Sequence, residues 1–204
     1  MANLLNINPS NPQARLLHKA ISCLQNGGLI VYPTDSCYAF GCTLGNKEAL
    51  ERIARIRSLS EDHHFTLVCR DLSDLATYAV VDNATYRFLR AHIPGPYTFL
   101  LPGTKEVPRR LLHPKRKGIG LRVPDHAIAQ ALLEQLGEPL LSSTVVLPGD
   151  PTPLPDAASI QERIGKQVDL IIDGGPCGTE PTTVIELYGP PVIVRQGKGQ
   201  IKGA

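Results

Sequence analysis

Along most of this chain, segments with apolar residues at helical spacing alternate with short apolar runs typical of buried strands. From Pro12 to Leu24 apolar residues return every three or four positions, which indicates an amphipathic helix, and Asn26–Gly28 then supplies a stop. The next run, Leu29–Tyr32, is short, apolar and bounded by glycines and Pro33, as a buried strand is. The first part of the chain therefore predicts a helix that leads into a strand.

The same alternation continues toward the C-terminus. The further predicted helices are one capped by Asn46, Leu72–Tyr78, Asn83–His92, Asp125–Leu136, and one capped by Asp156 that ends near Ile164. The further predicted strands are Phe65–Cys69, Tyr97–Leu101, Gly118–Val123, Pro139–Leu147, Val168–Ile172, Thr182–Leu187 and Pro191–Arg195. Gly189 and Pro190 join the last two strands, which predicts a hairpin. The expected fold is therefore mixed α/β (α+β), and not a purely parallel, doubly wound sheet.

The chain has 204 residues, of which 42% are hydrophobic, so it can form one compact domain. No apolar run approaches the roughly 20 residues of a membrane-spanning helix, and residues 1–11 lack the features of a signal peptide. We therefore expect a cytoplasmic protein without a membrane partner. The chain has an odd number of cysteines, five, and no CxxC pair, which favours reduced thiols over a set of disulfides. Cys37 and Cys42 with His63 and His64 match no common zinc pattern, so no structural metal is expected.

Positive charge is concentrated in one segment, although the formal net charge is only +2. Between Lys105 and Arg122, seven cationic residues accompany a single carboxylate, Glu106. This segment is either a solvated connecting loop or an anion site for nucleotide phosphates or an RNA backbone. The candidate RNA-binding residues are Arg109, Arg110, Lys115, Arg116 and Lys117. Few aromatic residues lie between them, so stacking of single-stranded bases is not predicted.

A second basic feature is Arg55-Ile56-Arg57, at the end of a predicted helix and shortly before His63 and His64. Cations at a helix C-terminus are expected from the helix dipole alone. Two guanidinium groups separated by one residue can also converge on one phosphate, whose oxygens they match bidentately. The sequence contains no P-loop, GxGxxG, GxSxG or HExxH motif. A bound nucleotide would therefore be held by basic side chains and by hydroxyls at strand ends.

Several motifs in a fixed order resemble one known family. They are Gly27–Ser36, Tyr38, Gly41, Arg55–Arg57, Pro94–Phe99, Gly120–Pro124 and Pro181–Ile185. Together they resemble the YrdC-like family, whose activity is threonylcarbamoyl-AMP synthesis. The resemblance covers a single domain at about residues 10–197 and leaves residues 198–204 as a C-terminal tail. Arg55–Arg57, Thr104–Leu112 and Lys166–Ile172 resemble its YciO subgroup more closely than its housekeeping synthases.

The resemblance implies a twisted mixed sheet with helices around a concave, positively charged cavity. It also implies ATP or AMP and L-threonine as ligands, with Mg²⁺ accompanying ATP, in the first step of the t6A modification of tRNA. The residues that would face threonine are Thr34, His64, Arg122 and Thr182. The residues that would face the nucleotide are Arg55, Arg57, Thr98, Thr144 and Arg195. Arg55 and Arg57 would be the catalytic residues among them.

Two positions depart from the pattern of the family's synthases. The usual Lys-x-Arg motif is Arg55-Ile56-Arg57 here, and the usual Ser-x-Asn motif aligns with Thr144-Val145-Val146. The first change replaces an ammonium by a planar guanidinium, and the second removes an amide. Loss of one contact to a developing charge raises a barrier by about 2.7 to 4 kcal/mol, so we expect weak or altered synthase activity. The alternative is a non-catalytic module that binds double-stranded RNA or tRNA.

Overall fold

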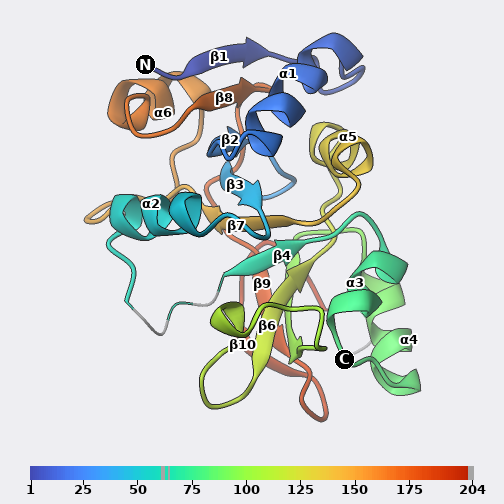
Figure 1. Ribbon diagram of the computed structural model, residues 1–204. Coiled ribbons are helices and arrows are strands. Elements are labelled where there is room, and N and C mark those ends of the chain that lie inside the picture. The colour runs from blue at the N-terminus through green and yellow to red at the C-terminus, as the bar shows by residue number, and fades with distance from the viewer. Residues whose placement is uncertain (61–62, 64, 202–204) are drawn as a thin grey trace.

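The computed structural model describes residues 1–60, 63 and 65–201. Within this part of the chain, ten strands form a single twisted sheet that six α-helices accompany (Figure 1). The helices are α1 (Ala14–Gln25), α2 (Lys47–Arg57), α3 (Leu72–Tyr78), α4 (Asn83–His92), α5 (Ala127–Leu136) and α6 (Ala157–Ile164), and a 3-10 turn spans Arg109–Leu111. The strands are β1 (Asn3–Asn6), β2 (Ile30–Tyr32), β3 (Ala39–Thr43), β4 (Thr66–Val68), β5 (Tyr97–Pro102), β6 (Gly118–Arg122), β7 (Leu140–Thr144), β8 (Leu170–Asp173), β9 (Thr183–Glu186) and β10 (Val192–Arg195). The predicted mixed α/β fold is confirmed.

The strands follow the order β1-β8-β2-β3-β7-β4-β6-β5-β9-β10 and pair in both directions. β1, β8 and β2 run parallel, as do β4 with β6 and β5 with β9, while the other neighbours are antiparallel. The last two strands form the antiparallel pair that Gly189 and Pro190 predicted. The sheet is therefore mixed, as expected.

Two of these strands, β1 and β3, have no counterpart among the elements predicted from the sequence. β1 is a short edge strand of Asn, Leu, Leu and Asn that pairs only with β8, far away in the chain. β3 contains Gly41, which β-strands disfavour. Gly41 is required there because a Cβ atom at this position would lie 2.9 Å from the Tyr32 ring on β2. Both strands thus depend on long-range or close-packing contacts that local pattern does not contain.

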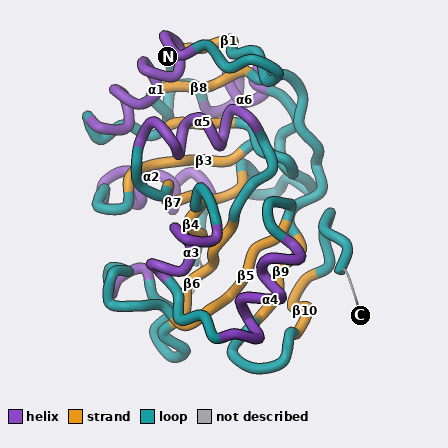
Figure 2. The backbone as a smooth tube through the Cα atoms, turned by 90° about the vertical axis from the view of Figure 1, so that its right-hand side faces the viewer, coloured by secondary structure: helices purple, strands orange, loops and turns teal. Residues whose placement is uncertain are grey.

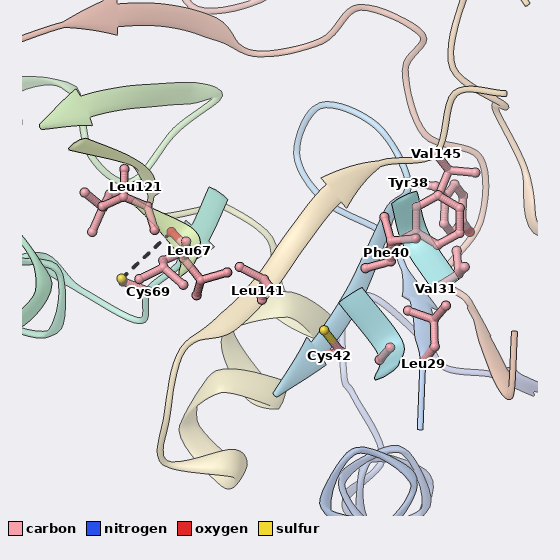
Figure 3. Packing of buried hydrophobic residues seen from close by; sticks show 14 of the residues in the cluster. Leu29, Val31, Tyr38, Phe40, Cys42, Leu67, Cys69, Leu121, Leu141 and Val145 are labelled. Carbon is pink, nitrogen blue, oxygen red and sulfur yellow. Dashed lines mark hydrogen bonds between the residues drawn. The ribbon is translucent and has the colours of Figure 1, made fainter. Parts of the chain in front are cut away.

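Both faces of the sheet pack apolar side chains, as the alternation along β2 shows. Val31 belongs to a cluster with residues of α2, α3, α4 and α6, whereas Ile30 and Tyr32 belong to a cluster with residues of α1 and α5. Figure 3 shows part of the first cluster, in which Val31 and Phe40 lie near Tyr38 and Val145. The tube view in Figure 2 shows how the sheet twists between its two ends. Because successive side chains of a strand point to opposite faces, the sheet separates two layers of helices.

The helix ends follow the expected capping chemistry. Asn46 accepts a hydrogen bond from the Ala49 amide (3.0 Å), and Asp156 accepts one from the Ser159 amide (2.8 Å). α1 ends before Gly28, where a Cβ atom would lie 2.7 Å from the Cys23 carbonyl oxygen. Glycine is therefore needed at position 28 because the chain packs closely against Cys23, and also because it ends the helix.

The chain outside residues 10–197 also belongs to the folded body. β1 precedes residue 10 and pairs with β8. After residue 197, the Gly199 carbonyl accepts a hydrogen bond from the Thr183 hydroxyl (2.6 Å), and the Gln200 carbonyl accepts one from the Tyr97 hydroxyl (2.7 Å). All five cysteines are free thiols. In the described part of the chain, no helix has the length and apolar character needed to cross a membrane.

Candidate functional site

A cavity of about 840 Å³ lies against one face of the sheet. Alternate residues of two strands line it, Thr66 and Val68 of β4 and Thr98 and Leu100 of β5, together with the consecutive residues Ser142–Thr144 of β7. Side chains two residues apart share one face of a strand, so this pattern identifies the floor of the cavity as the sheet itself. The walls come from the end of α2, the proline-rich loop around residues 151–153, the loop 179–182, and β10.

Gly120 of β6 leaves space in the floor of the cavity between two threonines. It pairs with Thr66 in the sheet register. A Cβ atom at Gly120 would lie 3.0 Å from the Thr66 hydroxyl oxygen and 3.3 Å from the Thr98 methyl carbon. The glycine of the Gly120-Leu121-Arg122 motif therefore leaves room for hydroxyl groups to face the cavity.

Arg57, the last residue of α2, enters the cavity from one side. Its Nε donates to the Val146 carbonyl (3.3 Å), and its Nη1 donates to the Ser143 hydroxyl. Burial, together with the positive charge of Arg195, lowers the pKa of Arg57 to about 10. The guanidinium is thus held by neutral oxygens, in surroundings where an anion would relieve both causes of the shift.

Arg195 of β10 lines the same cavity from the edge of the sheet. Its Nη2 donates to the Thr182 carbonyl (2.8 Å), and burial lowers its pKa. The Thr182 hydroxyl lies 2.8 Å from the Thr98 hydroxyl. Among the described residues neither Arg195 nor Arg57 forms a salt bridge with a carboxylate. Two guanidinium groups without a carboxylate partner in one cavity are suited to bind a polyanion such as a chain of phosphates.

Arg122, at the end of β6, is the third arginine of the cavity and is 7% exposed. Its Nη2 donates to the Thr34 hydroxyl (3.2 Å) and forms an ion pair with Asp35. The other oxygen of Asp35 accepts the Asp125 amide (3.1 Å). The Nε atom of Arg122 is buried and has no hydrogen-bond partner among the described residues. Arg122 is therefore an ion-paired cation whose Nε and Nη1 groups donate to no other described residue.

His126, which precedes α5, lies close to this ion pair. Burial lowers its pKa, while the Asp35 carboxylate acts in the opposite direction. The charges of Asp35 and Arg122 therefore both influence the pKa of the His126 imidazole.

Six of the residues proposed from the sequence line the cavity: Arg57, Thr98, Thr144, Arg195, Arg122 and Thr182. Thr34 does not line the cavity, but its hydroxyl accepts a hydrogen bond from Arg122. His64 lies outside the described residues. The structure therefore brings together most of the two predicted ligand sets, the nucleotide set and the threonine set.

Arg55 does not share this site with Arg57. α2 continues through Arg57, so the two side chains point about 200° apart around the helix axis. Arg55 is exposed and is absent from the cavity wall. The expectation that both guanidinium groups converge on one phosphate is therefore wrong for this backbone.

Several lining residues were not proposed from the sequence, among them Ser143, His63 and Glu180. Ser143 accepts from Arg57 and lies 3.5 Å from the Nε2 atom of His63. Its only sequence signal is its place directly before Thr144. Glu180 is the single acidic residue among the described cavity-lining residues, and it directly precedes the motif Pro181–Ile185.

The candidate RNA-binding residues lie elsewhere. Arg109, Arg110, Lys115, Arg116 and Lys117 are all exposed, and none of them lines the 840 Å³ cavity. Arg110 donates to the Gly45 carbonyl (3.1 Å). Arg116 pairs with Glu186 and lies over the Tyr188 ring, with 5.7 Å between its guanidinium carbon and the ring centre. Part of this charge is thus used within the fold.

Val146 lies at the position where the synthase pattern has an asparagine. Its side chain lines the cavity and its carbonyl oxygen accepts from Arg57. The neighbouring Val145 is fully buried in the core. An amide at position 146 would therefore face the cavity and the guanidinium of Arg57, not the core. Within the described ranges, no cluster of three or more His, Cys, Asp or Glu side chains could hold a metal ion.

Comparison with known proteins gives consistent relatives. A family model of Sua5, YciO and YrdC proteins, described as telomere recombination, matches residues 22–197. YciO of Escherichia coli K12 is 56% identical over 203 residues, which cover 99% of this chain and 98% of YciO. The crystal structure of E. coli YciO covers the same shares of the two chains, with a TM-score of 0.96.

Two more distant relatives have names that state an activity or a ligand. A threonylcarbamoyl-AMP synthase of Photobacterium profundum is 30% identical over 186 residues, which cover 89% of this chain and 98% of the synthase. The crystal structure of P. abyssi Sua5 complexed with L-threonine has a TM-score of 0.86 at 25% identity. It covers 95% of this chain, which spans 57% of that protein.

Proposed function

The chain belongs to the Sua5, YciO and YrdC family, and from this membership we propose that its cavity binds ATP or AMP and L-threonine. We further propose a weak or altered L-threonylcarbamoyladenylate synthase activity. The observation that carries the proposal is the convergence of half-buried Arg57 and of Arg195, neither with a carboxylate partner among the described residues, in one cavity floored by threonine hydroxyls.

The proposed reaction joins L-threonine, bicarbonate and ATP. The threonine nitrogen and bicarbonate form an N-carboxy intermediate with loss of water. A carboxylate oxygen of that intermediate then attacks the α-phosphorus of ATP, a P–O bond forms, and the bond to the β-phosphate oxygen breaks to release diphosphate. Such an in-line displacement requires positioning and charge neutralisation more than a protein nucleophile. Arg57 and Arg195 are the groups of this chain placed to neutralise the phosphates.

We assign the part of the cavity around Arg122 to L-threonine. Arg122 offers a guanidinium for the amino-acid carboxylate and donates to the Thr34 hydroxyl, while the Thr182 hydroxyl belongs to the same cavity. The relative complexed with L-threonine supports this choice of ligand. Mg²⁺ would enter as part of the ATP complex and supply further charge neutralisation on the phosphates.

Val146 is the reason to expect a low rate. It contributes an apolar wall beside Arg57, where an amide would both donate and accept hydrogen bonds. Loss of one such contact to a developing charge is worth about 2.7 to 4 kcal/mol of barrier. The cavity therefore keeps its cationic groups but lacks one polar group facing them.

The direct test mixes the protein with ATP, L-threonine and bicarbonate and measures diphosphate and the acyl adenylate. Product above a no-protein control at high enzyme concentration supports the synthase activity. Purified adenylate and diphosphate are also incubated with the protein, because the reverse reaction reveals a slow enzyme that forward synthesis misses. If neither direction is catalysed, the synthase activity is wrong, and ATP and L-threonine titrations then test ligand binding separately.

A second candidate is a non-catalytic module for double-stranded RNA or tRNA, acting in the cytoplasm. It is favoured by the five exposed cations between Arg109 and Lys117, three of which line a separate hollow of about 550 Å³. Phosphate contacts would dominate such binding. Contacts to 6 to 10 phosphates predict an affinity loss of roughly 10³ to 10⁵ between 50 and 200 mM salt, so a shallow salt dependence excludes this function.

A further inference from the structure

Asp35 lies behind Arg122 and is among the most buried charged groups of the molecule. The Arg122 and Asp35 side chains are 8% and 11% exposed, and they form the most buried ion pair in the described part of the chain. One carboxylate oxygen binds Nη2 of Arg122, and the other accepts the Asp125 amide at 3.1 Å. Asp35 is thus fixed to the backbone on one side and fixes the guanidinium on the other.

This ion pair sets Arg122 apart from the other two arginines of the cavity. Arg57 and Arg195 form no ion pair with a carboxylate in the described residues, whereas Arg122 is neutralised by Asp35. A neutral pair attracts phosphate anions weakly, but its guanidinium still has N–H groups that suit a carboxylate. An α-amino acid is a zwitterion without net charge, so its affinity depends little on whether the charge of Arg122 is neutralised.

We propose that Asp35 makes the part of the cavity around Arg122 specific for a zwitterionic amino acid over a phosphate anion. It does so by fixing the guanidinium through Nη2, which leaves Nη1 for the substrate carboxylate, and by cancelling its net charge. Asp35 is a positioning and specificity-determining residue in this role, since its carboxylate is bonded to Arg122 and to the Asp125 amide. The inference rests on the proposed function of the cavity.

Asp169 provides a matched control. Its carboxylate also binds an arginine, Arg52 (2.7 Å), and a backbone amide, that of Leu29 (2.7 Å). Neither Asp169 nor Arg52 lines the cavity. Replacing Asp169 therefore removes the same kinds of bonds without changing the proposed amino-acid site.

The experiment measures L-threonine, ATP and diphosphate binding by calorimetry for the wild-type protein, Asp35→Asn, Asp35→Glu and Asp169→Asn. In Asp35→Asn we expect L-threonine affinity to fall about tenfold and diphosphate affinity to rise about threefold, because Arg122 then carries a net charge. Asp35→Glu keeps the ion pair and lengthens it, so we expect wild-type diphosphate affinity and about a threefold loss for L-threonine. Asp169→Asn is expected to bind all three ligands like the wild type.

A purely structural role of Asp35 predicts a different result, namely that all three ligands weaken together in Asp35→Asn. That result, or unchanged L-threonine and diphosphate affinities, would overturn the inference. If Asp35→Asn does not fold, wild-type L-threonine affinity in Asp35→Glu overturns it. If the wild-type protein itself binds neither ATP nor L-threonine, the proposed function fails, whereas normal wild-type binding with an inert Asp35 rejects only this inference.

Discussion

Two groups of cationic residues in this protein have similar composition and very different surroundings. Arg57, Arg122 and Arg195 come from three separate parts of the chain and meet in one cavity. The five cations between Arg109 and Lys117 are neighbours in sequence and stay exposed. Burial lowers the pKa values of Arg57, which is half-buried, and of Arg195, which still reaches solvent at the edge strand β10.

The comparison teaches that local charge density in the sequence is a poor guide to an anion site. Exposed cations are screened by salt and hydrated by solvent, so each contributes little to a specific ligand. Desolvated cations held by neutral oxygens interact more strongly with an anion because the surrounding dielectric is lower. We therefore attribute nucleotide binding to the dispersed arginines, and assign at most non-specific polyanion binding to the contiguous segment.

The largest effect is expected at Val146, in the wall beside Arg57. Val146→Asn together with Thr144→Ser should raise adenylate formation by about 10² to 10³, because an amide returns to the phosphate end of the cavity. Adding Arg55→Lys should change nothing further, since Arg55 does not line the cavity. Turnover and melting temperature are measured on the same proteins.

Val194→Asn is the control for this gain, because Val194 lines the same cavity from β10 and is already exposed. It should leave turnover unchanged. A folded Val146→Asn variant without any gain would indicate that the cavity performs other chemistry or none.

A smaller effect is expected when the exposed segment is neutralised. Replacing Arg109, Arg110, Lys115 and Arg116 by serine should weaken any binding of double-stranded RNA about tenfold or more, because phosphate contacts are lost. The affinity for ATP should stay within about twofold of the wild type, since these side chains lie outside the cavity. Filter binding at two salt concentrations and calorimetry measure the two quantities. A large loss of ATP affinity would contradict the separation of the two regions.

The smallest effect concerns pH. Arg57 is charged below its pKa of about 10 and loses its proton as the pH rises through that value. AMP affinity should therefore be almost constant between pH 7 and 9 and fall about twofold near pH 10. Arg57→Ala should remove this decrease, and the difference between the two profiles isolates Arg57 from other groups. Identical profiles for both proteins would place Arg57 away from the phosphate.

Local pattern predicted most of the fold, because buried strands such as β2 and capped helices such as α2 carry their signals in adjacent residues. It missed β3, whose Gly41 is explained only by the neighbouring Tyr32 ring. For the site, family motifs identified Arg57, Arg122 and Arg195. The sequence contained no sign that Asp35 neutralises only one of them, because that ion pair spans 87 residues.

The central claim is that desolvated Arg57, and not basic charge in general, binds the nucleotide phosphates. Calorimetric titration of ATP into the wild type, Arg57→Ala and Arg55→Ala tests it directly. The two variants remove the same side chain from the same helix, one inside the cavity and one in solvent. We predict at least about a tenfold loss of affinity for Arg57→Ala and wild-type affinity for Arg55→Ala. Equal losses in both variants, or no loss in Arg57→Ala, would contradict the account.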